Sequence, residues 1–146
     1  MKSKPGYVFD SNVVVSAVLF HQGKPAQAVE AALDSGEILV SEDIVRELND
    51  VLSRPKFERY ASEEDRVRFL QSLLQEARLI EVVETIQACR DPKDNKYLEA
   101  AVGGGAECIV SGDDDLLVLH PFREIPILRP REFLDRLQGR TPQKEA

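Results

Sequence analysis

The sequence predicts an α/β fold, a three-layer α/β/α sandwich with a central parallel sheet of about five strands. Short apolar runs alternate with amphipathic segments of helical period along nearly the whole chain, which is typical of parallel strands joined by helices on both faces. The length of 146 residues fits one domain with a core of its own. Two of the apolar runs end in acidic residues, which directs attention to one edge of the sheet.

The first third of the chain carries two expected strands. Residues 6–10 are apolar and rich in aromatic and β-branched types, as in a strand. Residues 13–20 are also β-branched, but a buried helix fits the alternating pattern better. Pro25 suits the first turn of a helix that reaches Leu33. Residues 37–40 are the second expected strand.

Two amphipathic helices are expected next. Ser41 caps the first, which runs to about Leu52 with its apolar residues on one stripe. The second begins at Ser62, where Asp65 provides a weak form of the capping box, and it runs to about Arg78. The sequence Arg54-Pro55 separates them.

The last third repeats the alternation. Three more strands are expected, over residues 79–83, 107–110 and 125–128. A helix begins at Asp91-Pro92, with an acid at the cap and proline at the first position, and the run Gly103-Gly104-Gly105 ends it. Leu116 starts a short helix or turn, and the final helix spans residues 130–137.

We expect one domain over residues 1–138 and a polar C-terminal tail over 139–146. The longest apolar run, residues 13–20, is too short to cross a bilayer, and no stretch resembles a signal peptide. These features predict a soluble, cytoplasmic protein without a membrane partner. Cys89 and Cys108 lack the spacing of metal ligands and are interpreted as buried free thiols.

The net charge of −7 does not favour a nucleic-acid-binding protein, because phosphate contacts usually need a basic face. The charge is compatible with an acidic site that holds divalent cations. Basic residues could nevertheless form a local stripe. They include Lys24, Arg54, Lys56, Arg59, Arg66 and Arg68.

Acidic residues follow two of the expected strands. Asp10 comes directly after the first, and the run Asp113-Asp114-Asp115 follows Cys108-Ile109-Val110 by two residues. In open parallel sheets, ligands bind beyond the carboxyl ends of the strands, where the strand order reverses. If the two strands are neighbours, Asp10 and Asp113 face each other across a crevice. Such clustering of like charge is unfavourable unless a cation or solvent relieves it.

Glu47 and Asp94 are the other candidates. Glu47 lies at the margin of an apolar helix stripe, where a solvated side chain is the simplest interpretation, although it could point into the crevice. Asp94 lies in the first turn of its helix, where an acid is favourable in any case, and Asp91 and Asp113 could be caps. Together, four carboxylates without obvious basic partners suit Mg²⁺ or Mn²⁺, and the sequence offers no His or Cys set for zinc.

These stretches resemble a PIN-domain nuclease, most closely the bacterial branch found in toxin–antitoxin pairs. The resemblance runs from about residue 6 to 137. It rests on the local sequences around four acids and implies a ribonuclease that depends on Mg²⁺ or Mn²⁺. By this resemblance the metal-site and catalytic acids would be Asp10, Glu47, Asp94 and Asp113. Asp115 would assist as a further ligand, and Ser11 and Asn12 would support the site.

The resemblance also implies an RNA substrate, a homodimer and a small antitoxin partner, for which helices 41–78 are a plausible surface. A metal-bound water with a lowered pKa would attack phosphorus in line. Two other classes stay open. The first is a phosphatase or phosphoacceptor domain. A phosphatase of the haloacid type would have Asp at the position of Asn12, and a receiver domain would have Lys at the position of Arg129. A non-catalytic binding module with the same fold is the third possibility.

Overall fold

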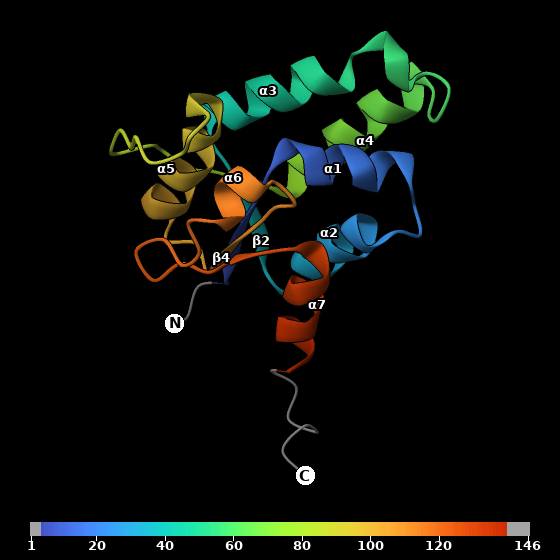
Figure 1. Cartoon of the computed structure of the whole chain (residues 1–146). Coiled ribbons are helices and arrows are strands. Elements are labelled where there is room, and N and C mark those ends of the chain that lie inside the picture. Colours follow the sequence, from blue (N-terminus) through green and yellow to red (C-terminus); the bar gives the residue numbers. More distant parts are fainter. Residues whose placement is uncertain (1–3, 140–146) are drawn as a thin grey trace.

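The computed structural model describes residues 4–139 and contains one sheet of five parallel strands (Figure 1). The strands are β1 (Gly6–Phe9), β2 (Glu37–Val40), β3 (Arg78–Leu79), β4 (Cys108–Val110) and β5 (Ile127–Leu128), in the spatial order β3-β2-β1-β4-β5. Helices flank this sheet on both faces, so the predicted α/β sandwich with five parallel strands is confirmed.

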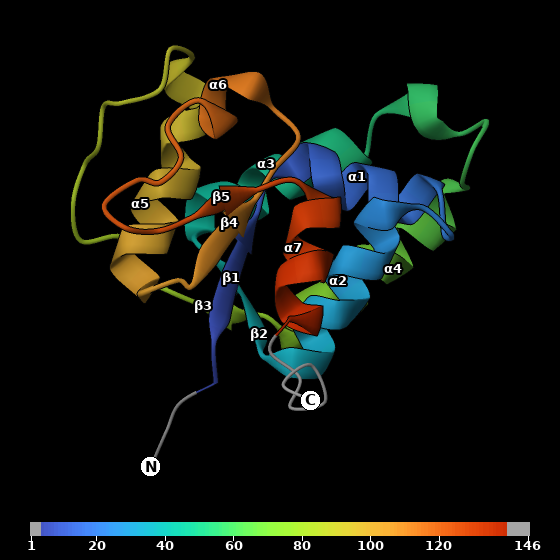
Figure 2. The ribbon, with the colours of Figure 1, turned by 60° about the horizontal axis from the view of Figure 1, so that its bottom comes forward.

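The helices form the two outer layers. They are α1 (Ser11–Leu19), α2 (Lys24–Ser35), α3 (Glu42–Leu52), α4 (Glu63–Glu76), α5 (Asn95–Gly104), α6 (Asp114–Leu117) and α7 (Pro130–Gln138), with 3-10 turns η1 (Pro55–Phe57) and η2 (Pro92–Asp94). On one face α5 packs against β1, β2 and β4, and on the other α2 and α7 pack together (Figure 2). Helix α1 lies between α2 and α3 (Figure 1).

The neighbouring strands β1 and β4 define where the site can form. Phe9 pairs with Val110 in parallel register, and the Asp10 amide donates to the Val110 carbonyl at 3.1 Å. The residues that follow the two strands, Asp10 and Ser111, therefore lie side by side. The strand order reverses between β1 and β4, which is the position where open parallel sheets bind ligands.

Residues 11–19 are helical despite their β-branched composition, as the alternating pattern predicts. The Asp10 carboxylate caps this helix by accepting the Val13 amide at 2.9 Å. The residues Val13, Val14, Val15, Ala17 and Val18 are all buried. Packing on several sides thus outweighs the weak helix propensity of valine.

An aromatic cluster fixes α7 on the sheet. Phe133 is fully buried and makes edge-to-face contacts with Tyr7 and Phe9, at ring-centroid distances of 5.0 and 5.8 Å. Tyr7 and Phe9 share one face of β1 because side chains alternate along a strand. Large aromatic side chains bury much apolar area, so this contact holds the C-terminal helix against the first strand.

The expected strands over residues 79–83 and 125–128 are longer than the observed ones. Strand β2 ends at Val40, where Ser41 begins the cap of α3, so only Arg78 and Leu79 find a full partner. Residues 81–83 are exposed. At the other edge, Ile125 pairs with Phe122 in an antiparallel bridge and only Ile127 and Leu128 join the sheet.

The helix predicted to end at the run Gly103-Gly104-Gly105 extends to Gly104. It ends at Gly105, which has the left-handed φ of 64° that favours glycine at this position. Gly103 is needed for close packing instead, since a Cβ there would lie 2.8 Å from the Glu81 carbonyl oxygen. The glycine run therefore combines a packing contact with a helix end.

Arg66 is buried, so its predicted place in a basic surface stripe is wrong. Its guanidinium donates to the backbone carbonyls of Leu52 at 2.7 Å, Arg54 at 3.1 Å and Ala61 at 3.0 Å. It also pairs with Glu58 at 2.7 Å. These bonds close the turn between α3 and α4. The Arg66 side chain therefore has a structural role, because it donates hydrogen bonds to carbonyls that have no helical partner at the end of α3.

Cys108 is buried and Cys89 is half-buried, and neither forms a disulfide. Between residues 4 and 139, none of the helices has the length and apolar content to cross a membrane. Apart from Gly139, the expected tail over residues 139–146 lies outside the described residues. The domain boundary at 138 stays a prediction.

Replacing Arg66 by Met should lower the free energy of unfolding by about 3 kcal/mol. The change leaves buried carbonyls without donors, at about 1–3 kcal/mol for each unsatisfied group. Urea denaturation followed by circular dichroism measures the effect. Arg68→Met is the matched control, because Arg68 forms only exposed ion pairs within α4, and it should change stability by less than about 1 kcal/mol. Equal effects of the two substitutions would contradict the role of Arg66.

Candidate active site

Asp10 is held rigidly at the carboxyl end of β1. It is 3% exposed, one carboxylate oxygen accepts the Val13 amide at 2.9 Å, and the other accepts the Ser111 hydroxyl. Burial raises the pKa of Asp10, and the hydrogen bonds from Ser111 and Val13 oppose that effect without cancelling it. The nearby charge of Asp113 raises the pKa further.

Ser111 connects the ends of the two central strands. Its hydroxyl donates to Asp10 and accepts the Asp113 amide at 3.0 Å, so one fully buried oxygen fixes both acidic residues. A hydroxyl can donate one hydrogen bond and accept others, which is what this position requires. The predicted proximity of Asp10 and Asp113 therefore has an identified cause.

Three carboxylates converge next to this junction. One oxygen from each of Asp94, Asp113 and Asp115 lies within 4.8 Å of the other two. Asp94 ends the turn η2, and Asp113 caps α6 by accepting the Asp115 amide at 2.9 Å. The predicted capping role of Asp113 is thus compatible with its place in the cluster.

Asp94 has an oxygen that is free to bind a cation. Its Oδ2 is buried and has no hydrogen-bond partner among residues 4–139. Burial raises the pKa of Asp94 to about 7, with the Asp113 charge as the next cause. A buried oxygen without a donor is unfavourable, and three oxygen ligands suit a hard divalent cation. The residues therefore fit Mg²⁺ or Mn²⁺.

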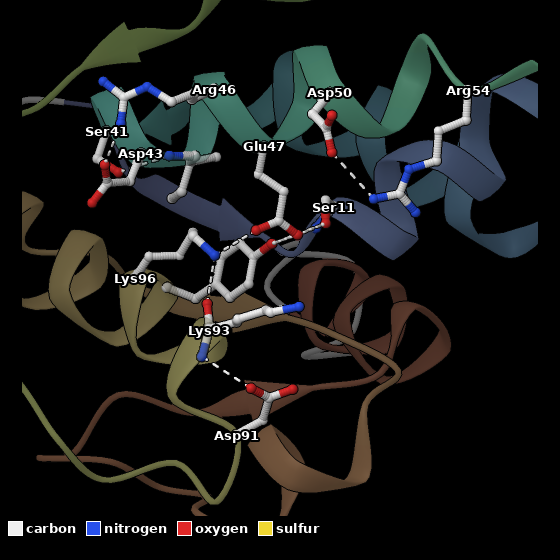
Figure 3. Close-up of polar contacts among 12 residues, drawn as sticks. Ser11, Ser41, Asp43, Arg46, Glu47, Asp50, Arg54, Asp91, Lys93 and Lys96 are labelled. Carbon is white, nitrogen blue, oxygen red and sulfur yellow. Dashed lines mark hydrogen bonds and ion pairs between the residues drawn. The ribbon is translucent and has the colours of Figure 1, made fainter.

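Glu47 occupies a separate network beside the cluster. Figure 3 shows its side chain reaching from α3 toward Ser11 on α1 and Lys96 on α5. It accepts the Ser11 hydroxyl at 2.6 Å and forms an ion pair with Lys96. The Tyr97 hydroxyl lies 3.2 Å from the same carboxylate. Burial alone would raise the pKa of Glu47, but the hydrogen bonds from Lys96 and Ser11 hold this pKa below its usual value.

The expectation that the four acids lack basic partners is wrong for Glu47, and Asp115 beside them also has a basic partner. Lys96 pairs with Glu47 and also donates to the Lys93 carbonyl, and its side chain is only 17% exposed, so this pair is held in place. Arg90 pairs with Asp115 at 3.2 Å, but Arg90 is 86% exposed and its contact is screened by solvent. Glu47 is thus neutralised by a fixed partner, and Asp115 by an exchangeable one.

The predicted supporting residues differ in what they do. Ser11 bonds Glu47, and its amide donates to the Tyr97 hydroxyl at 3.1 Å, so it joins α1 to α3 and α5. Asn12 is exposed and lines a hollow that also contacts Asp113. The structure therefore links Asp10, Asp94, Asp113 and Asp115 closely and connects Glu47 to them through α1.

Sequence reasoning missed three residues of the site. Ser111 could have been found from the strand register, because it stands directly opposite Asp10. Lys96 and Tyr97 follow Asp94 on α5, but they read as ordinary members of an amphipathic helix. No pattern within α5 indicates that they meet a glutamate from α3, 49 and 50 residues away in sequence.

Comparisons with known proteins agree with this geometry. The family model described as PIN domain matches residues 6–115, which include all five acids discussed above. The chain belongs to the PIN domain family. Membership in this family supports a nuclease, a hydrolase of phosphodiester bonds, and the acidic cluster is consistent with a divalent cation. No curated protein sequence matches the chain.

Two solved structures share the fold of this PIN domain. One is PAE2754 from Pyrobaculum aerophilum, with a TM-score of 0.63 and 15% identity, covering 93% of this chain and 91% of that chain. The other is VapBC2 from Rickettsia felis bound to a DNA fragment from its promoter, with a TM-score of 0.58 and 14% identity. That match covers 84% of this chain and 96% of the other. At these identities the likeness supports the fold alone.

The metal-free domain should lose stability as the pH rises from about 4 to about 7. The pKa of Asp94 is about 7 in the fold against 3.8 for the free group, so the folded state binds its proton more tightly and ionisation destabilises it. Solvent screens this half-buried group, so we expect a loss of about 1–2 kcal/mol. Thermal melts in chelator measure it.

Asp94→Asn should remove most of this pH dependence, whereas Asp135→Asn on the exposed face of α7 should retain it. Added Mn²⁺ should stabilise the unaltered domain more at pH 8 than at pH 5, because the cation replaces the proton. A pH dependence that persists in Asp94→Asn would assign the effect to other groups.

Ser111→Ala should weaken Mn²⁺ binding by about 10- to 100-fold, the usual effect of losing a hydrogen bond that orients metal ligands. Isothermal titration calorimetry measures the affinity. Ser53→Ala serves as the control, since its hydroxyl bonds only the Asp50 carbonyl of its own helix. Unchanged Mn²⁺ affinity in folded Ser111→Ala would show that Ser111 does not organise the site.

Proposed function

We propose that this PIN-domain protein is an endoribonuclease that depends on Mg²⁺ or Mn²⁺ and is the toxin of a toxin–antitoxin pair. The observation that carries the proposal is the unsatisfied, buried oxygen of Asp94 beside Asp113 and Asp115. A structural acid cluster would be expected to place its oxygens on donors or in solvent. The family membership supports phosphodiester hydrolysis.

Within this proposal, Asp94, Asp113 and Asp115 hold the cation, and Asp10 completes the site next to Asp113. A bound divalent cation supplies a water of lowered pKa and stabilises charge that develops on the phosphate oxygens. Asp10 is fixed by Val13 and Ser111, so its carboxylate is oriented before substrate arrives. The chain needs no nucleophilic side chain of its own for this chemistry.

Glu47 acts in the proposal by positioning. Its pair with Lys96 and its bond to Ser11 tie α3, α5 and the first turn of α1 together. That turn also receives the capping bond of Asp10. Glu47 therefore controls the orientation of Asp10 through α1, and the ion pair with Lys96 keeps Glu47 ionised.

The proposed antitoxin is a small protein that covers an apolar groove. A cavity of about 310 Å³ lies between α1, α2 and α4, lined by apolar residues that include Ala17, Val29, Leu33 and Phe69. Nearby, Phe20 and Tyr60 are about half exposed and contact each other edge-to-face. The solved VapBC2 structure is consistent with such a partner. A homodimer and a cytoplasmic location are part of the same proposal.

Two other classes receive less support. A phosphatase or phosphoacceptor domain is disfavoured by the match to the PIN family. A non-catalytic module would not need a buried oxygen without a hydrogen-bond donor at Asp94. Incubation with a generic aryl phosphate, which only a phosphatase would hydrolyse, separates the first of these from a nuclease.

Asp10→Asn and Asp113→Asn should each reduce RNA cleavage by at least about 100-fold, which corresponds to about 2.7 kcal/mol in the barrier. Each removes a charge from the cluster while keeping the shape of the side chain. Cleavage is measured on defined RNAs with Mn²⁺, Mg²⁺ or chelator, and Asp135→Asn is the control. Full activity of both folded variants, or cleavage that survives chelation, would contradict the proposal.

A further inference from the structure

A second feature adjoins the acidic cluster. A hollow of about 660 Å³ lies between the first turn of α1 and the beginnings of α2 and α7, and Asp113 forms part of its wall. Its polar and charged lining residues are Asn12, Ser16, Lys24, Asp113, Arg129 and Arg131. The hollow therefore opens directly beside the proposed cation site, on surface that the cluster itself does not use.

The charge of this hollow is opposite to that of the whole chain. The sequence has 19 basic and 26 acidic residues, yet three cations and one acid line this hollow. Arg129 makes one exposed contact with Asp114 at 3.4 Å. Over the part of the chain that the structure describes, Lys24 and Arg131 take part in none of the ion pairs. Their charges are therefore available to a ligand.

The backbone adds to the positive character. Helices α2 and α7 both begin at this hollow and pack side by side (Figure 2). The first turn of a helix carries free N–H groups and the positive end of the helix dipole. Pro25 and Pro130 occupy the first turns, so each helix has one amide less to offer, and the side-chain cations supply most of the field.

We propose that this hollow binds the sugar-phosphate backbone of single-stranded RNA next to the bond that is cleaved, with Lys24 and Arg131 contacting its phosphates. The inference rests on the proposed ribonuclease function and deepens it. A strand whose scissile phosphate lies at Asp113 continues over the adjoining surface, and this cationic hollow adjoins Asp113. Backbone phosphates are recognised through such charges without regard to base sequence.

This position also explains how an acidic protein can hold RNA. The acids of the cluster would be neutralised by the bound cation. Two acids near the hollow, Asp114 and Glu132, contact Arg129 and leave Lys24 and Arg131 free of ion pairs among the described residues. Exposed charges farther away than about 10 Å are largely screened at ordinary ionic strength. The local charge at the hollow, rather than the net charge of −7, then decides the interaction with a phosphate.

The test compares two charge reversals on the same helix. Arg131→Glu alters the hollow, whereas Arg136→Glu changes the net charge equally at an exposed position that does not line it. Binding of a fluorescein-labelled single-stranded RNA is followed by fluorescence anisotropy with Mn²⁺, with every variant made in the Asp10→Asn background, so that the cation is bound and cleavage does not consume the probe. Lys24→Glu and Lys56→Glu form a second matched pair.

We expect Arg131→Glu and Lys24→Glu each to weaken RNA binding by about 10-fold or more. Each should also reduce the slope of log affinity against log salt by about 0.7, the value for one phosphate contact on a single strand. The two controls should stay within about 3-fold of the unaltered protein. Equal losses in the matched variants, or no loss in any, would overturn the inference.

Kinetics with Mn²⁺ separate this inference from the proposed function. Arg131→Glu should raise KM with kcat nearly unchanged, because the residue contacts substrate away from the reacting phosphate. Normal kcat and KM in both hollow variants would overturn the inference while the ribonuclease proposal stands. RNA binding that depends on Lys24 and Arg131 without any cleavage would support the hollow as a binding site and overturn the ribonuclease proposal.

Discussion

The parallel pairing of β1 with β4 is the constraint on which the site depends. Because Phe9 stands opposite Val110, the chain must place Asp10 and Ser111 next to each other at the edge of the sheet. A slip of one residue would turn every side chain of β1 to the other face and separate Asp10 from Ser111. The aromatic contacts of Tyr7 and Phe9 with Phe133 make such a slip costly. The register that builds the core therefore also builds the acidic junction.

The fold tolerates repulsion between the carboxylates at that junction because the other polar groups there have hydrogen-bond partners. Asp10 and Asp113 each accept a backbone amide, and both are joined through the Ser111 hydroxyl. The unfavourable interactions then fall on Asp94, whose buried oxygen lacks a donor and whose pKa rises to about 7. A carboxylate whose pKa is shifted by burial and by a neighbouring like charge is typical of a functional site. The same arrangement would be hard to explain as a device for stability.

The sequence predicts those features that depend on local pattern. The alternation of apolar runs and amphipathic segments is sufficient for the sheet and its helices, and the acids after the strands indicate the edge that matters. Features that depend on distant partners could not be predicted. Arg66 looks like a surface cation until α3 supplies carbonyls for it, and Glu47 looks unpaired until α5 brings Lys96. The length of β3 is likewise set by where β2 ends.

Net charge is a poor guide to what this surface can bind, and the reason is geometric. Within the described residues, several ion pairs join neighbours on one helix, such as Asp50 with Arg54 and Glu64 with Arg68, so these charges cancel locally. Asp94 and Asp113, by contrast, lie together with Asp115 and take part in none of the ion pairs among the described residues, and there a cation would compensate their charges. Lys24 and Arg131 lie beside that point and make none of those helix pairs. A phosphate chain arriving there meets a positive field on both sides of Asp113 once the cation is bound, although the molecule as a whole is acidic.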